Sequence, residues 1–259
     1  MNPSEKITLY VDLTSQPCRS VVCLAKMLEI PYEEVFIAFY QLKGDKKFRN
    51  FYKEVNPLFT IPSMSVGDTH IIESGTMARY LGAHAKNSKY YDTTNKRLVN
   101  QVEEFFVFYH KVLRPMMMLI FYEIMATPQE KKLAYDLKEA LEITHRALST
   151  FERTYLKGDN RKFILGDQFT VCDVWAFSEI FHLNAVEYDI RVKFPKVFEW
   201  LKRCYTSEKV LRDVHDDIWR HFIHWRGHKY WFEDRLSVQD KKKKEPKNRY
   251  WFERVPISS

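Results

Sequence analysis

Glycine is scarce in this sequence, with only 7 glycines among 259 residues, against roughly 7% in average globular proteins. So few glycines argue against a turn-rich all-β fold and against a phosphate-binding loop that needs several of them. No apolar run approaches the roughly 18 residues of a membrane-spanning helix. The polar stretch Met1–Lys6 has no apolar signal core behind it. We therefore expect a globular, cytoplasmic protein.

Cysteine is also sparse, and its spacing matches no paired set of metal ligands. The four cysteines are scattered along the chain as Cys18, Cys23, Cys172 and Cys204. In a chain of this length, that usage is typical of reduced thiols in a reducing compartment. We expect neither a disulfide scaffold nor a metal site.

The charge is concentrated in one segment. The whole chain carries a net charge of +7, and residues 218–259 hold 11 Lys and Arg against 5 Asp and Glu, so the rest is nearly neutral. Two near-repeats, 229–233 and 249–253, flank the lysine run Lys241–Lys244. Three interpretations stay open for this tail. Its aromatic residues pack on the body or on a second subunit, it binds an anionic membrane or nucleic acid, or its lysines target the chain.

Residues 1–86 alternate between short strands and helices. Ser15 and Pro17 have helix-start chemistry, since serine caps helices and proline is tolerated in the first turn. Gly67-Asp68 is typical of a hairpin turn. We expect strands at 8–13, 32–39, 63–66 and 70–72, and helices after Ser15, at 45–55 and at 74–85.

The pattern changes after residue 86. Residues 87–94 have no periodicity and form an expected linker. The following segment, 95–225, has apolar residues at helical spacing throughout, with a capping box of Thr170 and Asp173 and a helix that begins at Pro195. The basic aromatic segment 226–259 is an extension. The sequence thus predicts an α/β N-terminal domain followed by an all-helical one.

Three motifs resemble one known family. They are the segment Leu9–Arg19 (LYVDLTSQPCR), the segment Asn56–Pro62 (NPLFTIP), and the pair Glu73-Ser74 that opens a helix. With the capping box, these look like a cytosolic glutathione transferase, and the first resembles the theta class in particular. The resemblance spans roughly residues 7–217. It implies a thioredoxin-like domain that binds glutathione as co-substrate, a helical domain with an electrophile site, and a homodimer.

The resemblance implies that Ser15 is the catalytic residue. Conjugation needs a thiolate, because the thiol form is a poor nucleophile. A hydroxyl that donates a hydrogen bond to the sulfur favours the charged form, and the helix start adds a partial positive charge. Three alternatives stay open: Ser15 only caps the helix, Tyr10 supplies the hydroxyl, or Cys18 reacts. Tyr10 lies within a strand and fits packing better, and Cys18 lacks a second thiol at the position of Ser15.

The resemblance also implies the glutathione-binding residues. A cis bond before Pro62 leaves the backbone of Ile61 to pair with the cysteinyl part of glutathione. The start of the helix at Ser74 suits the γ-glutamyl carboxylate, since helix N-termini attract anions, and Glu73 suits the ammonium group. The glycine carboxylate needs a cation, for which Lys46 and Lys47 are the nearest match. The expected glutathione-binding set is Gln16, Lys46, Lys47, Ile61, Pro62, Glu73 and Ser74.

The electrophile site is expected at Arg114, Met116 and Trp219. A salt bridge is the alternative role for Arg114, and helix core is the alternative for Met116. The expected activity is detoxification by conjugation of glutathione to small apolar electrophiles, with hydroperoxide reduction as a further activity. The competing function is a non-catalytic binding or scaffold protein whose tail contacts a polyanion or a membrane.

Overall fold

The computed structural model describes residues 6–37, 51, 53–87, 89–120, 137–158, 161–186 and 188–216. These residues form two compact units. The first contains the described chain up to Phe106 together with Phe169–Ser178, and the second contains Val107–Gln168 and the described chain from Glu179 onward. The domain boundaries expected from the sequence remain predictions.

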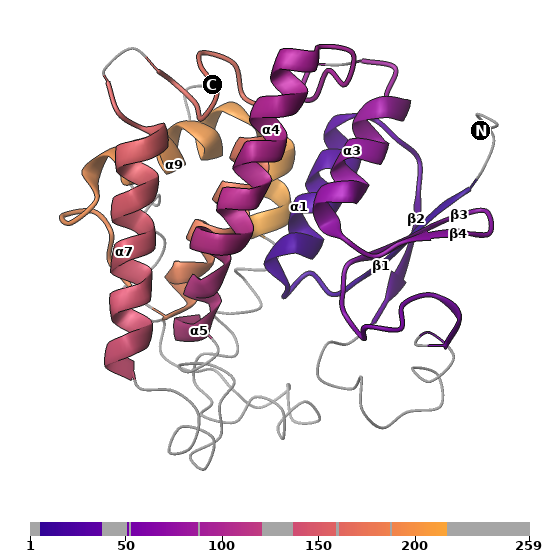
Figure 1. The fold of residues 1–259 in the computed structure, drawn as a ribbon, viewed down its shortest axis with the longest axis horizontal. Coiled ribbons are helices and arrows are strands. Elements are labelled where there is room, and N and C mark those ends of the chain that lie inside the picture. Colours follow the sequence, from indigo (N-terminus) through magenta and orange to yellow (C-terminus); the bar gives the residue numbers. More distant parts are fainter. Residues whose placement is uncertain are drawn as a thin grey trace. The chain divides into compact units, whose positions relative to one another are not determined.

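A four-stranded mixed sheet organises the first unit (Figure 1). Its strands are β1 (Ile7–Val11), β2 (Glu33–Phe36), β3 (Ser63–Val66) and β4 (Thr69–Ile71), in the order β2-β1-β3-β4. Strand β1 runs parallel to β2 and antiparallel to β3, and β3 and β4 form the predicted hairpin. All four expected strands are confirmed. The parallel pair requires a crossover, which α1 supplies.

Two helices of the first unit differ in how much of their length is buried. Helix α1 (Gln16–Met27) is buried at every position except Lys26, because its central segment is apolar on all sides. Helix α3 (Ser74–His84) contacts α1 and buries Met77, Ala78 and Leu81. The unit also contains most of α4 (Lys96–Phe108) and of α8 (Val171–Phe181), up to Phe106 and Ser178 respectively.

The regular elements that the structure describes in the second unit are helices and helical turns, apart from one isolated β-bridge between Phe163 and Gly166. After α4 come the π-helical turn η2 (Tyr109–Leu113), the 3-10 turns η3 (Arg114–Met116) and η5 (His182–Val186), and the helices α5 (Met117–Ile120), α7 (Leu137–Tyr155) and α9 (Pro195–Ser207). Phe151 of α7 packs edge-on against Trp200 of α9, with ring centroids 5.1 Å apart. The predicted all-helical second half is thus confirmed.

The capping box at the start of α8 differs in part from the prediction. As expected, the Asp173 carboxylate reaches back and accepts from the backbone N–H of Thr170 at 2.9 Å. The Thr170 hydroxyl donates to that same carboxylate at 3.1 Å. A capping box pairs the Asp173 N–H with the Thr170 hydroxyl, but here the Asp173 N–H donates to the Thr170 carbonyl at 3.0 Å. An ionised carboxylate only accepts, so it draws both donors of Thr170.

Several expectations fall outside the described residues. These are Lys46, Lys47, Trp219, the extension 226–259 and most of the helix expected at 45–55. Across the described helices, none is both long and apolar enough to cross a membrane. All four cysteines lie within the described part, where each is buried and none forms a disulfide.

Candidate functional site

The strand register brings three predicted segments to one end of the sheet. Tyr10, next to the end of β1, pairs with Ser63 at the start of β3. Ile71, the end of β4, pairs with Met64 in β3. The loop after β1, the loop before β3 and the loop after β4 therefore emerge together. Those loops carry Ser15, Pro62 and Ser74.

A tight turn after β1 places Ser15 at the start of α1. The Asp12 carboxylate accepts from the backbone N–H of Thr14 at 2.9 Å and from its hydroxyl at 2.7 Å. The Ser15 N–H donates to the Asp12 carbonyl at 2.9 Å. Ser15 is the N-cap of α1 in an extended conformation (φ −80°, ψ 130°). The turn thus fixes the predicted catalytic serine at a helix N-terminus.

The Ser15 hydroxyl does not cap the helix. It makes no side-chain capping bond and is in hydrogen-bonding contact with the sulfur of Cys18. Cys18 is fully buried, and burial raises the pKa of its thiol to about 12. This thiol is protonated at neutral pH and is a poor nucleophile. The capping-only and reactive-cysteine alternatives therefore both lose support.

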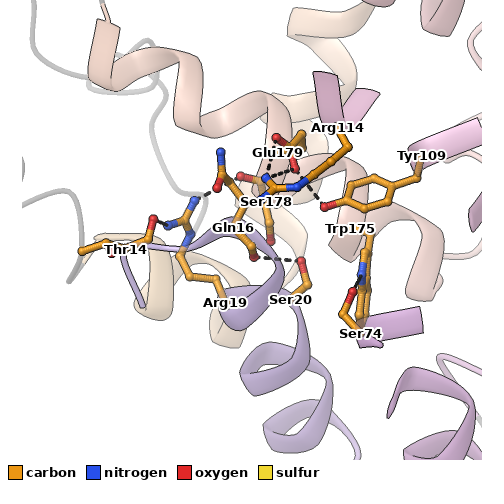
Figure 2. A network of polar contacts seen from close by, with 10 residues as sticks. All are labelled: Thr14, Gln16, Arg19, Ser20, Ser74, Tyr109, Arg114, Trp175, Ser178 and Glu179. Carbon is orange, nitrogen blue, oxygen red and sulfur yellow. Dashed lines mark hydrogen bonds and ion pairs between the residues drawn. The ribbon is translucent and has the colours of Figure 1, made fainter. Parts of the chain in front are cut away.

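A buried arginine holds the same turn from within. The Arg19 guanidinium donates from Nη1 to the carbonyl of Leu13 at 2.8 Å. It also donates from Nη1 to the carbonyl of Thr14 at 3.1 Å and from Nη2 to the carbonyl of Ser178 in α8 at 3.2 Å (Figure 2). The side chain is 1% exposed. The sequence motif includes Arg19 but gives it no role, because its partner Ser178 lies 159 residues away.

The loop before β3 depends on a buried asparagine. Asn56 donates from Nδ2 to the Thr60 carbonyl at 2.7 Å and to Ser63 Oγ at 2.9 Å, and its Oδ1 accepts from the Leu58 N–H at 2.8 Å. The bond before Pro62 is cis, as the resemblance implied. Asn56 is a site-organising residue that the sequence reasoning missed.

Glu73 and Ser74 lie at the start of α3, as predicted. Glu73 is the exposed N-cap, and its carbonyl accepts from the Met77 N–H at 2.9 Å. Ser74 is buried, and its Oγ accepts a hydrogen bond from the indole Nε1–H of Trp175 at 3.3 Å (Figure 2). No local pattern marks Trp175, which lies 101 residues further along the chain.

The other residues near β1 have different surroundings. Gln16, the first residue of α1, is buried, and its carbonyl accepts from Ser20 Oγ at 3.2 Å. The ring of Tyr10 packs on that of Phe51, with centroids 5.3 Å apart. Its hydroxyl lies 3.5 Å from Ser65 Oγ. This packing fits the interpretation of Tyr10 as a structural residue.

In the second unit, Arg114 pairs with a buried acid. Its Nη1 lies 3.2 Å from Oε1 and 3.3 Å from Oε2 of Glu179, and the Tyr109 hydroxyl donates to Oε2 at 2.8 Å (Figure 2). Glu179 is fully buried, whereas the Arg114 side chain is 25% exposed. Met116 is fully buried. Arg114 thus has the salt bridge of its alternative role, and Met116 lies in the core.

Two domain models of one family match this chain. The glutathione S-transferase N-terminal domain matches residues 9–89, and the glutathione S-transferase C-terminal domain matches residues 113–208. Together they cover more than half of the sequence. The chain belongs to the glutathione S-transferase family.

Theta-class members are among its relatives. Human glutathione S-transferase theta-1 is 27% identical over 223 residues, covering 82% of this chain and 88% of the relative. Mouse theta-3 is also 27% identical, with the same coverage. The apo structure of human T1-1 matches with a TM-score of 0.69 and 26% identity, covering 82% of this chain and 89% of that one. Human theta-2, solved in complex with glutathione and an unknown ligand, has the same fold (TM-score 0.69, 23% identity, 83% and 88% coverage).

Family membership suggests glutathione conjugation. In this glutathione S-transferase, the described members of the predicted glutathione site (Ser15, Gln16, Ile61, Pro62, Glu73 and Ser74) all lie in the first unit, around the three converging loops. Arg114 and Met116 lie in the second unit. No cluster of three His, Cys, Asp or Glu residues suited to a metal ion occurs in the part of the chain that is described.

Proposed function

We propose that this glutathione S-transferase ionises bound glutathione with the Ser15 hydroxyl and conjugates the thiolate to small apolar electrophiles. The observation that carries the proposal is the N-cap hydroxyl that makes no capping bond with its own helix. A free thiol with a pKa of about 8.5 is only slightly ionised at neutral pH. A donated hydrogen bond and the positive end of α1 both favour the thiolate.

The same proposal assigns the rest of the tripeptide. The backbone of Ile61 pairs with the cysteinyl residue, and Pro62 and Gln16 border it. Ser74 and the first turn of α3 bind the γ-glutamyl carboxylate, because the first amides of a helix have no partner within it. Glu73 binds the ammonium group, and its exposure leaves it accessible to a ligand. Lys46 and Lys47 bind the glycine carboxylate.

The second substrate is proposed to contact Arg114 and Trp219, with hydroperoxide reduction as a further reaction of the same thiolate. The setting is proposed to be cytoplasmic detoxification by a homodimer. The four cysteines support a reducing compartment, because all are buried and none forms a disulfide.

Ser15→Ala tests the proposed role of the hydroxyl. We expect kcat/KM for a panel of electrophiles to fall by about 10²-fold, the lower end of the loss seen when one preorganised donor is removed. Glutathione affinity should change by less than threefold, since the binding groups remain. The pKa in the pH–rate profile should rise towards that of the free thiol.

Ser20→Ala is the matched control. Ser20 lies on the helix that Ser15 begins, is fully buried, and donates to the Gln16 carbonyl within that helix. It should keep the wild-type pH–rate profile. Glutathione binding without turnover in the wild type would favour the competing function, a scaffold whose basic tail contacts a polyanion or a membrane.

A further inference from the structure

We propose that Trp175 is a positioning residue for the γ-glutamyl subsite, where its indole N–H commits the Ser74 hydroxyl to donating towards the ligand carboxylate. This inference rests on the proposed function, because it concerns how the same glutathione site is organised. It adds a residue from α8, outside the segment that carries the three glutathione-binding loops.

The direction of the hydrogen bond determines what Ser74 can offer a ligand. An indole N–H only donates, whereas a serine hydroxyl donates once and accepts through two lone pairs. At the 3.3 Å contact, Ser74 Oγ must therefore accept. Its single proton is directed away from Trp175. A carboxylate only accepts, so this orientation suits the γ-glutamyl carboxylate.

The packing around Trp175 holds the indole in place. Trp175 is fully buried. The ring of Phe106 meets it edge-on, with centroids 5.4 Å apart and planes at 88°. Phe106 also lies against Gly75, the residue after Ser74, where an added Cβ would lie 3.4 Å from its Cγ. Phe106 thus braces both the indole and the start of α3.

Helix α8 is itself anchored within the first unit. Its first turn is held by the hydrogen bonds between Thr170 and Asp173. Three residues after Trp175, the Ser178 carbonyl accepts from Arg19. These contacts hold the indole and the Ser74 hydroxyl in a fixed arrangement, and such preorganisation raises affinity.

Trp175→Phe removes the N–H and keeps most of the ring. We expect calorimetric titration to give about three- to tenfold weaker binding of glutathione, a fraction of what full loss of a hydrogen bond to a charged group would cause. Binding of 4-aminobutanoyl-cysteinylglycine, which is glutathione without the γ-glutamyl carboxylate, should not change. In kinetics, the loss should raise KM for glutathione more than it lowers kcat.

Two comparisons separate positioning from a general packing defect. In a Ser74→Ala background, Trp175→Phe should cause no further loss of glutathione affinity, because the coupling between the two residues is already gone. Trp200→Phe is the matched control, since Trp200 is also fully buried and packs edge-on against an aromatic ring, that of Phe151. It should lower the melting temperature without weakening glutathione binding.

The outcomes are distinct. Equal binding of glutathione by the wild type and Trp175→Phe, or the same loss with and without Ser74, would overturn the positioning role. If Trp175→Phe does not fold, Phe106→Leu removes the ring that packs against the indole instead. This variant should weaken the binding of glutathione more than the binding of the truncated ligand. Unchanged glutathione binding would overturn the inference. Failure of the wild type to bind glutathione would reject the proposed function itself.

Discussion

Arg114→Ala tests whether the ion pair of Arg114 with Glu179 stabilises the fold or whether Arg114 acts only on the substrate. The variant removes the cation from a carboxylate that stays fully buried, with Tyr109 still donating to Oε2. Breaking one side of a buried pair costs about 3–5 kcal/mol, because the remaining charge is left uncompensated. The Arg114 side chain is a quarter exposed. We therefore expect about 3 kcal/mol, the lower end of that range.

Urea unfolding of four variants measures this cost. They are the wild type, Arg114→Ala, Glu179→Gln and the double variant. Because Glu179→Gln removes the buried charge itself, the double variant should recover much of the stability that Arg114→Ala loses.

Two results would refute this reasoning. One is a loss below about 1 kcal/mol in Arg114→Ala, which is the scale of a surface ion pair. The other is a double variant no more stable than Arg114→Ala. If stability is unchanged and kcat/KM for electrophiles falls, the arginine acts on the substrate instead.

Three further perturbations follow from described contacts. Asn56→Ala should lower the free energy of unfolding in urea by about 2–4 kcal/mol, because several groups of the loop before Pro62 lose their hydrogen bonds. It should also raise KM for glutathione, and an unchanged KM would contradict a role of this loop in glutathione binding. Gly82→Ala usually gains about 1 kcal/mol in a helix, but here the new Cβ would lie 2.8 Å from Cδ1 of the buried Tyr91, so the melting temperature should fall, not rise. Burial raises the pKa of Cys18 and Cys23 from 9.0 to about 12. The unfolded chain therefore loses these protons first, and stability should fall from about pH 9 to pH 12 by about 1.4 kcal/mol per pH unit and thiol. Urea unfolding at pH 8, 9 and 10 measures how steeply the free energy of unfolding falls with pH. In Cys23→Ala this fall should be shallower by the contribution of one thiol.

Local signals in the sequence were sufficient for much of the fold. Strand β3 has the predicted bounds, 63–66, because turn residues flank it on both sides. The starts of α1 and α9 were predictable from Ser15 and Pro195, since capping and first-turn proline act within a few residues. Strand β2 was predicted longer, at 32–39, and β-forming residues alone do not reveal where pairing with β1 stops.

The organising contacts of the site were not predictable in this way. The motif Asn56–Pro62 was recognised as a binding loop, but the buried amide that holds it was not. The partners of Arg19 and Ser74 lie 159 and 101 residues away. No periodicity or spacing links residues at such separations, so only the folded chain identifies them. The lysines proposed for the glycine carboxylate lie outside the described residues and stay a prediction.

Helix α8 links two of the proposed glutathione-binding loops. Trp175 and Ser178 are three residues apart, which places them on neighbouring turns of one helix face. Through Ser178, the helix contacts the arginine that holds the turn before Ser15, and through Trp175 it contacts the hydroxyl at the start of α3. A shift of α8 along its axis would therefore disturb both the hydroxyl proposed to ionise the thiol and the proposed γ-glutamyl subsite. Because both contacts use groups of one rigid helix, the proposed glutathione site cannot be complete with the strands and helices of residues 1–86 alone.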